Sequence, residues 1–176
     1  RDALTGLLDR TRFDAEGRSL LNEALRANRP VSVTMVAIDR FGDLNPHADA
    51  PAGSDVLRQV AVDLTEGLRE RDRAYRYDAT EIVVLGDDLT HRAALLMAER
   101  LRRRISSPPG ADRVPITVSI GIATAPADGG DLAALLRVAD TRGRKARAEG
   151  GDRIVGHPEE DASASVARFP QRQEPV

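Results

Sequence analysis

Apolar residues recur along the chain with two kinds of spacing, and these spacings predict where the helices and strands lie. Apolar side chains three or four residues apart, separated by charged residues, predict amphipathic helices. Segments that alternate and are rich in β-branched residues predict strands. The predicted helices span residues 9–26, 54–68, 91–105 and 131–148, and the predicted strands span residues 31–39, 74–77, 81–85, 114–123 and 153–155.

Local signals refine two of these segments. Residues 31–39 alternate in part, which is typical of a half-buried strand, and this strand delivers Asp39 to its C-terminal end. Ser54 stands just ahead of a helical pattern, and we expect it to be the N-cap of that helix. Asp39 and Ser54 are therefore expected on either side of a loop that contains proline and alanine.

The order of the predicted elements indicates the fold class. Strands alternate with helices, but strands 74–77 and 81–85 are close enough to form a hairpin that turns at residues 78–80. A central hairpin excludes a simple doubly wound sheet. It favours an α/β (α+β) fold with a ferredoxin-like β-α-β-β-α-β core, in which helices flank a mainly antiparallel sheet. We expect one domain over residues 1–155 and a disordered tail over residues 156–176, where Pro, Glu, Ser and Ala dominate.

Composition narrows the class of protein. With 26 Lys and Arg against 28 Asp and Glu, the net charge is −2, which gives no general attraction to nucleic acid or to an anionic membrane. No stretch reaches the ~18 consecutive apolar residues of a membrane span. The absence of cysteine excludes disulfides and thiolate metal sites, so a reducing cytosol suits the chain and we expect it to be cytoplasmic. The histidines lack the spacing of metal ligands and are expected to face solvent: His47, His91 and His157.

Five sequence blocks carry a resemblance to a known family. Together they cover Asp2 to about Ile154, in the family's order and at its spacings. Residues 2–13 are similar to DxLTGLxNRxxF, residues 36–57 to DIDxFKxxNDxxGHxxGDxxL, residues 76–82 to RYGGDEF, residues 118–123 to TxSxGxA, and residues 139–147 to ADxALYxAK. The chain therefore resembles the GGDEF domain, the fold of bacterial diguanylate cyclases.

The resemblance implies a reaction for which this chain lacks key groups. Diguanylate cyclases make cyclic di-GMP from two GTP by attack of a ribose 3′-hydroxyl on the α-phosphate, a reaction that depends on charge neutralisation by divalent ions. The family holds Mg²⁺ with two carboxylates, and Ala37 and Thr80 stand at those positions here. Neither side chain offers a charged oxygen. We therefore expect a degenerate member with no catalytic residues, no metal ligands and no cofactor, with Mg²⁺ only where nucleotide binding persists.

The altered hairpin also implies poor binding of GTP. In the family motif, two glycines let the backbone approach the phosphates. Asp78 replaces the first of them and would repel a triphosphate. The five residues in place of GGDEF are Asp78, Ala79, Thr80, Glu81 and Ile82. The remaining residues of a vestigial nucleotide site are Asp39, Phe41, Asn45, Glu81 and Arg147. GTP binding is expected to be weak or absent.

One of these alignments has a simpler explanation, and another is incomplete. Asn45 matches a guanine contact of the family, but it is equally well explained as a turn residue before Pro46. Arg147 matches a phosphate-binding lysine of the family, whereas Gly151 stands where the family has an arginine.

Arg69 and Asp72 stand in the register of the family's product-binding RxxD motif. An arginine forks onto a phosphate or a guanine edge, and an aspartate accepts hydrogen bonds from guanine N1 and N2. Arg100, Arg102 and Arg103 are candidates for a second face of this site. The alternative is a solvated helix end at which Arg69 and Asp72 simply pair with each other.

Three functions follow from these observations. The first is a catalytically inactive domain that binds cyclic di-GMP or acts as a regulatory relay in second-messenger signalling. The second is a nucleotide-independent module that forms a homodimer or binds a regulatory protein. The third is an active cyclase with atypical metal ligands, in which Asp39 and Glu81 form a relocated, weak cation site.

Overall fold

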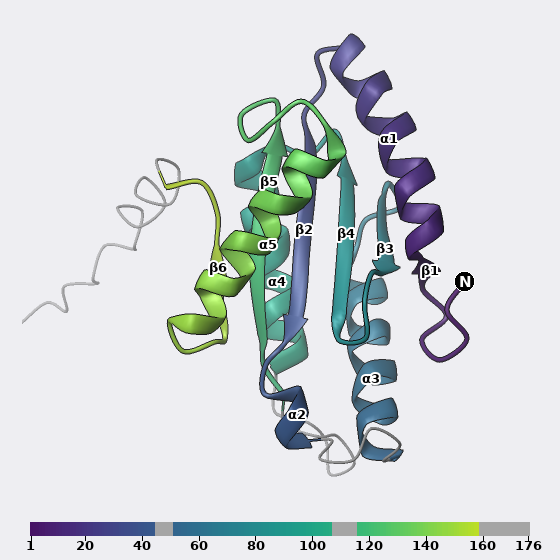
Figure 1. Ribbon diagram of the computed structural model, residues 1–176, viewed down its shortest axis with the longest axis vertical. Helices are drawn as coiled ribbons and strands as arrows, with labels where there is room; N and C mark the ends of the chain where they lie inside the picture. The colour runs from purple at the N-terminus through teal and green to yellow at the C-terminus, as the bar shows by residue number, and fades with distance from the viewer. Residues whose placement is uncertain (45–50, 107–115, 159–176) are drawn as a thin grey trace, which may run out of the picture.

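A computed structural model of the chain describes residues 1–44, 51–106 and 116–158, with only the backbone of residues 44, 51 and 52 (Figure 1). The helices are α1 (Arg10–Arg26), α2 (Phe41–Leu44), α3 (Pro51–Gly67), α4 (His91–Ser106) and α5 (Leu132–Ala148). The strands are β1 (Leu8–Asp9), β2 (Val31–Ile38), β3 (Asp72–Arg76), β4 (Glu81–Asp87), β5 (Val118–Ala125) and β6 (Arg153–Val155). No described helix is both long enough and apolar enough to cross a membrane.

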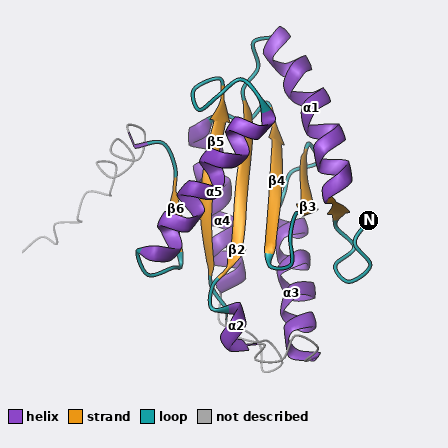
Figure 2. Cartoon of the chain, in the orientation of Figure 1, coloured by secondary structure: helices purple, strands orange, loops and turns teal. Residues whose placement is uncertain are grey.

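The described strands form one sheet in the order β1-β3-β4-β2-β5-β6. The four central strands pair with one another in antiparallel fashion, and β1 and β6 add to the two edges as short strands parallel to β3 and β5. Helix α3 connects β2 to β3 and α4 connects β4 to β5, while β3 and β4 form the predicted hairpin (Figure 2). This is the β-α-β-β-α-β arrangement of a ferredoxin-like core, so the predicted fold class is confirmed.

Helices cover both faces of the sheet. One core cluster packs α3 and α4 against the sheet, and a second packs α1 and α5 against the opposite face (Figure 2). All eight residues of β2 are consequently buried. The prediction of a half-buried strand is wrong, because the even-numbered side chains of β2 face α3 and α4 while the odd-numbered ones face α1 and α5.

Some predicted helix and strand ends need correction. Ser54 is not an N-cap, because α3 already begins at Pro51, and proline is well suited to a first helical turn. Helices α1 and α5 do have side-chain caps, since Asp9 accepts a hydrogen bond from Arg12 N and Asp131 accepts one from Ala134 N. The strand predicted from residue 114 is seen as β5, and its first predicted residues lie outside the described part of the chain.

His91 is buried rather than exposed, contrary to the sequence-based expectation. It is only 6% exposed, and its Nδ1 lies 3.3 Å from Thr124 Oγ1. Its Nε2 accepts a hydrogen bond from the His157 N–H at 2.9 Å. The packed chain therefore continues past residue 155, through Gly156 and His157. His47 and residues 159–176 lie outside the described residues.

Candidate functional site

The C-terminal end of β2 and the β3–β4 hairpin meet at one end of the sheet. Ala37 pairs with Glu81 of β4 and with Ser119 of β5, and the Ile38 N–H donates to the Thr80 carbonyl at 3.4 Å. The two positions at which the resemblance implies metal ligands are thus neighbours, but they carry a methyl group and a hydroxyl group. Among the described residues, no group of three or more His, Cys, Asp or Glu side chains could hold a metal ion.

Glu81 is the acidic side chain that the hairpin retains at this place. Burial raises its pKa, and the charges of Asp140 and Asp78 raise it further against the opposing charges of Arg147 and Arg144. Glu81 of β4 and Arg147 of α5 therefore lie close enough for their charges to interact. A half-buried carboxylate with a raised pKa is less suited to holding Mg²⁺ than a freely ionised one.

Other residues of the vestigial site have separate roles or lie outside the described structure. Phe41 of α2 packs against the core cluster on the α3 and α4 side of the sheet, so its ring contributes to the hydrophobic core. Asn45 lies outside the described residues. Among the described residues of this set, Phe41 therefore belongs to the core, while the charge of Arg147 reaches Glu81.

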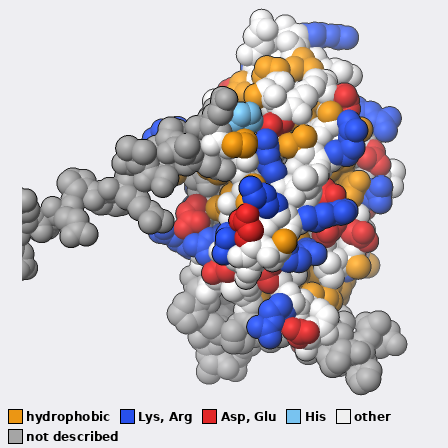
Figure 3. Space-filling view, turned by 60° about the vertical axis from the view of Figure 1, so that its left-hand side comes forward, with side chains coloured by type: hydrophobic (Ala, Val, Ile, Leu, Met, Phe, Trp, Pro, Cys, Tyr) orange, Lys and Arg blue, Asp and Glu red, His pale blue; other side chains and the backbone are white. Residues whose placement is uncertain are grey.

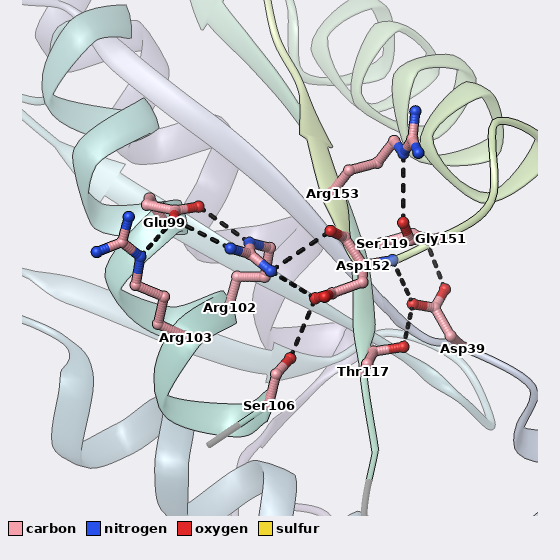
Figure 4. Close-up of polar contacts among 10 residues, drawn as sticks. All are labelled: Asp39, Glu99, Arg102, Arg103, Ser106, Thr117, Ser119, Gly151, Asp152 and Arg153. Carbon is pink, nitrogen blue, oxygen red and sulfur yellow. Dashed lines mark hydrogen bonds and ion pairs between the residues drawn. The ribbon is translucent and has the colours of Figure 1, made fainter. Parts of the chain in front are cut away.

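Asp39 is engaged in a structural network. Its carboxylate accepts hydrogen bonds from Thr117 Oγ1 at 2.7 Å, Ser119 Oγ at 2.6 Å and the Asp152 N–H at 2.8 Å (Figure 4). The residue is 6% exposed. Because the carboxylate is nearly buried and already accepts three hydrogen bonds, its contacts favour an anchor that joins β2, β5 and the turn after α5 over a cation ligand shared with Glu81.

Gly151 completes this anchor. Its φ of +75° is a conformation that favours glycine, and a Cβ at this position would lie 2.9 Å from Asp39 Oδ2. The resemblance places a phosphate-binding arginine of the family at this position. In this chain the Asp39 carboxylate occupies the space that a side chain would need.

Replacing Asp39 with alanine is expected to lower the free energy of unfolding by about 3 kcal/mol, because its buried hydrogen-bond donors lose their acceptor. Asp39→Asn keeps the shape and one acceptor, so the loss should be about half as large. Urea denaturation measures both. The control is Asp43→Ala, which removes only the exposed pair with Arg40 and should change stability by less than about 0.5 kcal/mol. An equally small effect at Asp39 would contradict the anchor.

Arg69 and Asp72 form a closed pair where α3 gives way to β3. Arg69 Nη2 donates to Asp72 Oδ1 at 3.0 Å, while its Nε and backbone N donate to Oδ2 at 3.0 and 3.3 Å. The Asp72 side chain is 0% exposed and that of Arg69 is 47% exposed. The hydrogen bond from Arg69 to Asp72 raises the pKa of Arg69. Like every arginine it is a cation, here at a half-open surface.

This pair lies in the wall of an open groove of about 670 Å³. The groove runs between the C-terminal half of α3, the N-terminal turn and the start of β3, and its apolar lining includes Leu7, Val62 and Ala74. The size suits a nucleotide, and Arg69 supplies a cation at its side. Figure 3 shows a different part of the surface, the side that carries β6 and α5, on which basic and acidic side chains are interspersed.

The three candidate arginines of α4 do not all point to the same side of the helix. Arg100 donates through Nε and Nη2 to the Gly67 carbonyl at 3.2 and 2.7 Å, which places its guanidinium group at the last residue of α3, two residues before Arg69. Arg102 instead binds Glu99 and Asp152, and Arg103 binds Glu99 (Figure 4). A helix turns about 100° per residue, so Arg102 points away from the side that carries Arg100. Arg100 and Arg103, which are three residues apart, share one side of α4 and both remain candidates for a second face of the groove.

One connection between the N-terminal turn and the hairpin was missed by sequence reasoning. Arg76 Nη1 donates to the two Asp2 carboxylate oxygens at 2.9 and 3.1 Å, and Arg76 Nη2 donates to the Ala79 carbonyl at 3.0 Å. Asp2 also accepts hydrogen bonds from Thr5, which lines the groove. Both ends of this link lie in blocks that carry the resemblance, but only the fold shows that they meet.

Comparison with known proteins gives consistent matches. Residues 1–153 match the family described as diguanylate cyclase, GGDEF domain. The response regulator PleD of Caulobacter vibrioides is 34% identical over 160 residues, which cover 88% of this chain and 35% of PleD. The chain spans about a third of the length of the curated relatives it matches.

Two solved structures show the same fold. The GGDEF domain of TpbB, also called YfiN, from Pseudomonas aeruginosa has a TM-score of 0.84 at 26% identity and covers 94% of this chain and 99% of its own. The GGDEF domain of DgcB from Caulobacter crescentus, solved in complex with c-di-GMP, has a TM-score of 0.79 at 24% identity and covers 88% of this chain and 91% of its own.

Proposed function

We propose that this chain, which belongs to the GGDEF domain family of diguanylate cyclases, does not synthesise cyclic di-GMP but binds it as a regulatory module. The observation that carries the proposal is the pair of positions at the end of the sheet. Ala37 lies opposite Glu81 and beside Thr80, where the reaction needs two carboxylates that hold a divalent ion. The domain proposed for this role comprises residues 1–155, with Gly156 and His157 packed against it, and is placed in the cytoplasm.

The chain also lacks groups that would bind the phosphates of GTP, in addition to the metal ligands. Asp78 is exposed at the hairpin turn, where its charge would repel the triphosphate of GTP. The arginine that the family places after the last helix is replaced by Gly151, and the Asp39 carboxylate fills that space. Restoring one carboxylate would therefore leave the phosphate contacts incomplete. We propose that no metal ion or other cofactor acts in this domain.

Incubation of the purified protein with GTP and Mg²⁺ or Mn²⁺ is expected to yield no cyclic di-GMP above the protein-free blank. Phosphoryl transfer relies on the neutralisation that the missing carboxylates would have positioned. Chromatographic separation of the nucleotides measures the product, with an active family member assayed in parallel. Product that disappears in Glu81→Ala would instead establish an active cyclase with atypical ligands.

Cyclic di-GMP is the ligand that the groove beside Arg69 fits best. Arg69 and Asp72 keep the spacing and register of the family's product-binding motif, and Arg100 lies close by at the end of α3. A domain of this fold, that of DgcB, has been solved with c-di-GMP. The ligand has two phosphates and two guanines, and an arginine at the rim of a partly apolar groove can recognise either group.

A nucleotide-independent interaction module is the second candidate, because the Arg69–Asp72 pair is also a sufficient end to α3 without any ligand. Its partner would be a second copy of the chain or a regulatory protein. A thermal-shift panel separates the two candidates. A ligand that binds only the folded state raises the midpoint of unfolding, so cyclic di-GMP should raise it and GTP should not.

A further inference from the structure

Residues 156–158, which follow β6, are held against the N-terminal end of α4. Strand β6 pairs with β5 over three residues and ends at Val155. Two residues further on, the His157 N–H donates to Nε2 of His91, the first residue of α4, at 2.9 Å. This hydrogen bond joins positions 66 residues apart in sequence, so it is a tertiary contact and not a local turn.

The contact fixes the protonation state of His91. A backbone N–H can only donate, so Nε2 must offer a lone pair, which it has only in the neutral ring. The proton of that ring is then on Nδ1, which lies 3.3 Å from Thr124 Oγ1 and can donate to it. A second proton, on Nε2, would point at the His157 N–H, one donor against another. Protonated His91 therefore cannot make this contact.

The place of His91 in the fold also disfavours the charged ring. The residue is 6% exposed, and burial penalises the charged form of a side chain. It lies in the first turn of α4, where the helix dipole gives a positive potential. A fall in pH therefore acts against the packed position of this side chain as well as against its hydrogen bond.

The nearest charged groups on the side of β5 and α5 are paired with each other. Arg142 donates through Nη1 and Nη2 to the two carboxylate oxygens of Asp128 at 2.8 and 2.6 Å. Burial raises the pKa of Asp128, but hydrogen bonds from Arg142 and the Thr124 N–H outweigh it, and the charge of His157 lowers it further. Asp128 and Arg142 thus keep their charges as the histidines titrate.

The charged groups on the side of β4 are paired or exposed. Asp87 forms an ion pair with Arg29, and Asp88, in the turn before α4, is exposed. Arg92, the neighbour of His91 in α4, is exposed as well, so water and salt screen its charge. Histidine is the side chain that ordinarily changes its charge between pH 7.5 and pH 5.0. Titration at this place in that range therefore involves His91 and His157.

We propose that His91 and the His157 N–H form a pH-sensitive latch, which holds residues 156–158 on α4 while His91 is neutral and releases them when it is protonated. The released ring takes up a proton that the latched ring does not, so the latched state loses stability as the pH falls. For a solvated histidine with a pKa of about 6.5, the equilibrium between the two states shifts by about thirtyfold between pH 7.5 and pH 5.0. The latch is separate from nucleotide binding in the groove beside Arg69.

Hydrogen exchange of the His157 amide measures the latch, because the bond to His91 protects this amide. Its protection factor, determined by NMR relative to the intrinsic exchange rate at each pH, is expected to fall at least about tenfold from pH 7.5 to pH 5.0 in the wild type. The amides of β2 should change by less than about threefold, which shows that the domain stays folded. The ring nitrogen chemical shifts of His91 should place its proton on Nδ1 at pH 7.5. Constant protection of His157 down to pH 5.0, or a proton on Nε2 at pH 7.5, overturns the latch.

Two substitutions identify the group that titrates. His91→Gln keeps an acceptor near the position of Nε2 but is not protonated in this range, so the protection of residue 157 should no longer depend on pH. His157→Ala removes the second ring and keeps the donating N–H, so it should retain the pH dependence of the wild type. Circular dichroism checks that both variants are folded. A fall in protection that persists in His91→Gln, or that disappears in His157→Ala, contradicts the assignment of the latch to His91.

Discussion

Arg69→Ala is expected to weaken cyclic di-GMP binding at least about thirtyfold, because the groove loses the cation that contacts the ligand. A hydrogen bond to a charged group contributes about 2 kcal/mol, which corresponds to this factor. The substitution also leaves the Asp72 carboxylate uncovered beside the ligand, where it would repel the phosphates. Calorimetric titration at fixed ionic strength measures the change.

Arg71→Ala is the matched control. Arg71 lies two residues further along the chain, is exposed, and lines the neighbouring groove beside α1 rather than the groove of Arg69. It removes the same charge from the same segment, so its effect should stay within about threefold if contact matters more than net charge. Equal losses in the two variants would show that the arginines act only through general electrostatic attraction.

Gly121→Ala is expected to lower the free energy of unfolding by at least about 3 kcal/mol, at the upper end of overpacking effects. Gly121 lies in β5 directly beneath α5. A Cβ there would stand 2.0 Å from the Ala139 carbonyl oxygen and 2.3 Å from the Gly143 nitrogen. These are backbone atoms, which cannot move aside like a flexible side chain, so α5 would have to shift away from the sheet.

Gly130→Ala is the control for this substitution. No atom lies within 4 Å of the position of its Cβ, and its backbone is not in the left-handed region. Its effect should therefore be within about 0.5 kcal/mol of zero, as for other surface substitutions. Urea denaturation of the two variants gives the comparison. A Gly121→Ala protein as stable as the wild type would contradict the close approach of α5 to β5.

The fold was largely predictable because its signals are local. Helical spacing, β-branched runs and the short gap at residues 78–80 were enough to place the hairpin inside an alternating pattern. The burial of β2 was not predictable in the same way. The hydroxyl side chains of Ser32 and Thr34 are typical of a strand side that faces solvent, but in β2 this side is covered by α3 and α4. Periodicity reports the polarity of a face and not what packs against it.

The sequence predicted which metal-binding carboxylates are missing from the site better than it predicted the contacts of the residues that remain. Ala37 and Thr80 follow from aligned blocks, and the structure brings them together through the register of β2 with β4. The role of Asp39 depends on Ser119 and Asp152, which are far away in sequence and meet it only in the fold. Such non-local hydrogen bonds leave no periodic signal.

The most direct test of the central claim is a calorimetric titration of the wild-type protein with cyclic di-GMP. The groove beside Arg69 predicts saturable binding with a dissociation constant in the micromolar range, for which about −8 kcal/mol of binding free energy is needed. Absence of heat and of saturation up to high micromolar concentrations of cyclic di-GMP would contradict the proposal that this domain binds the nucleotide it no longer makes.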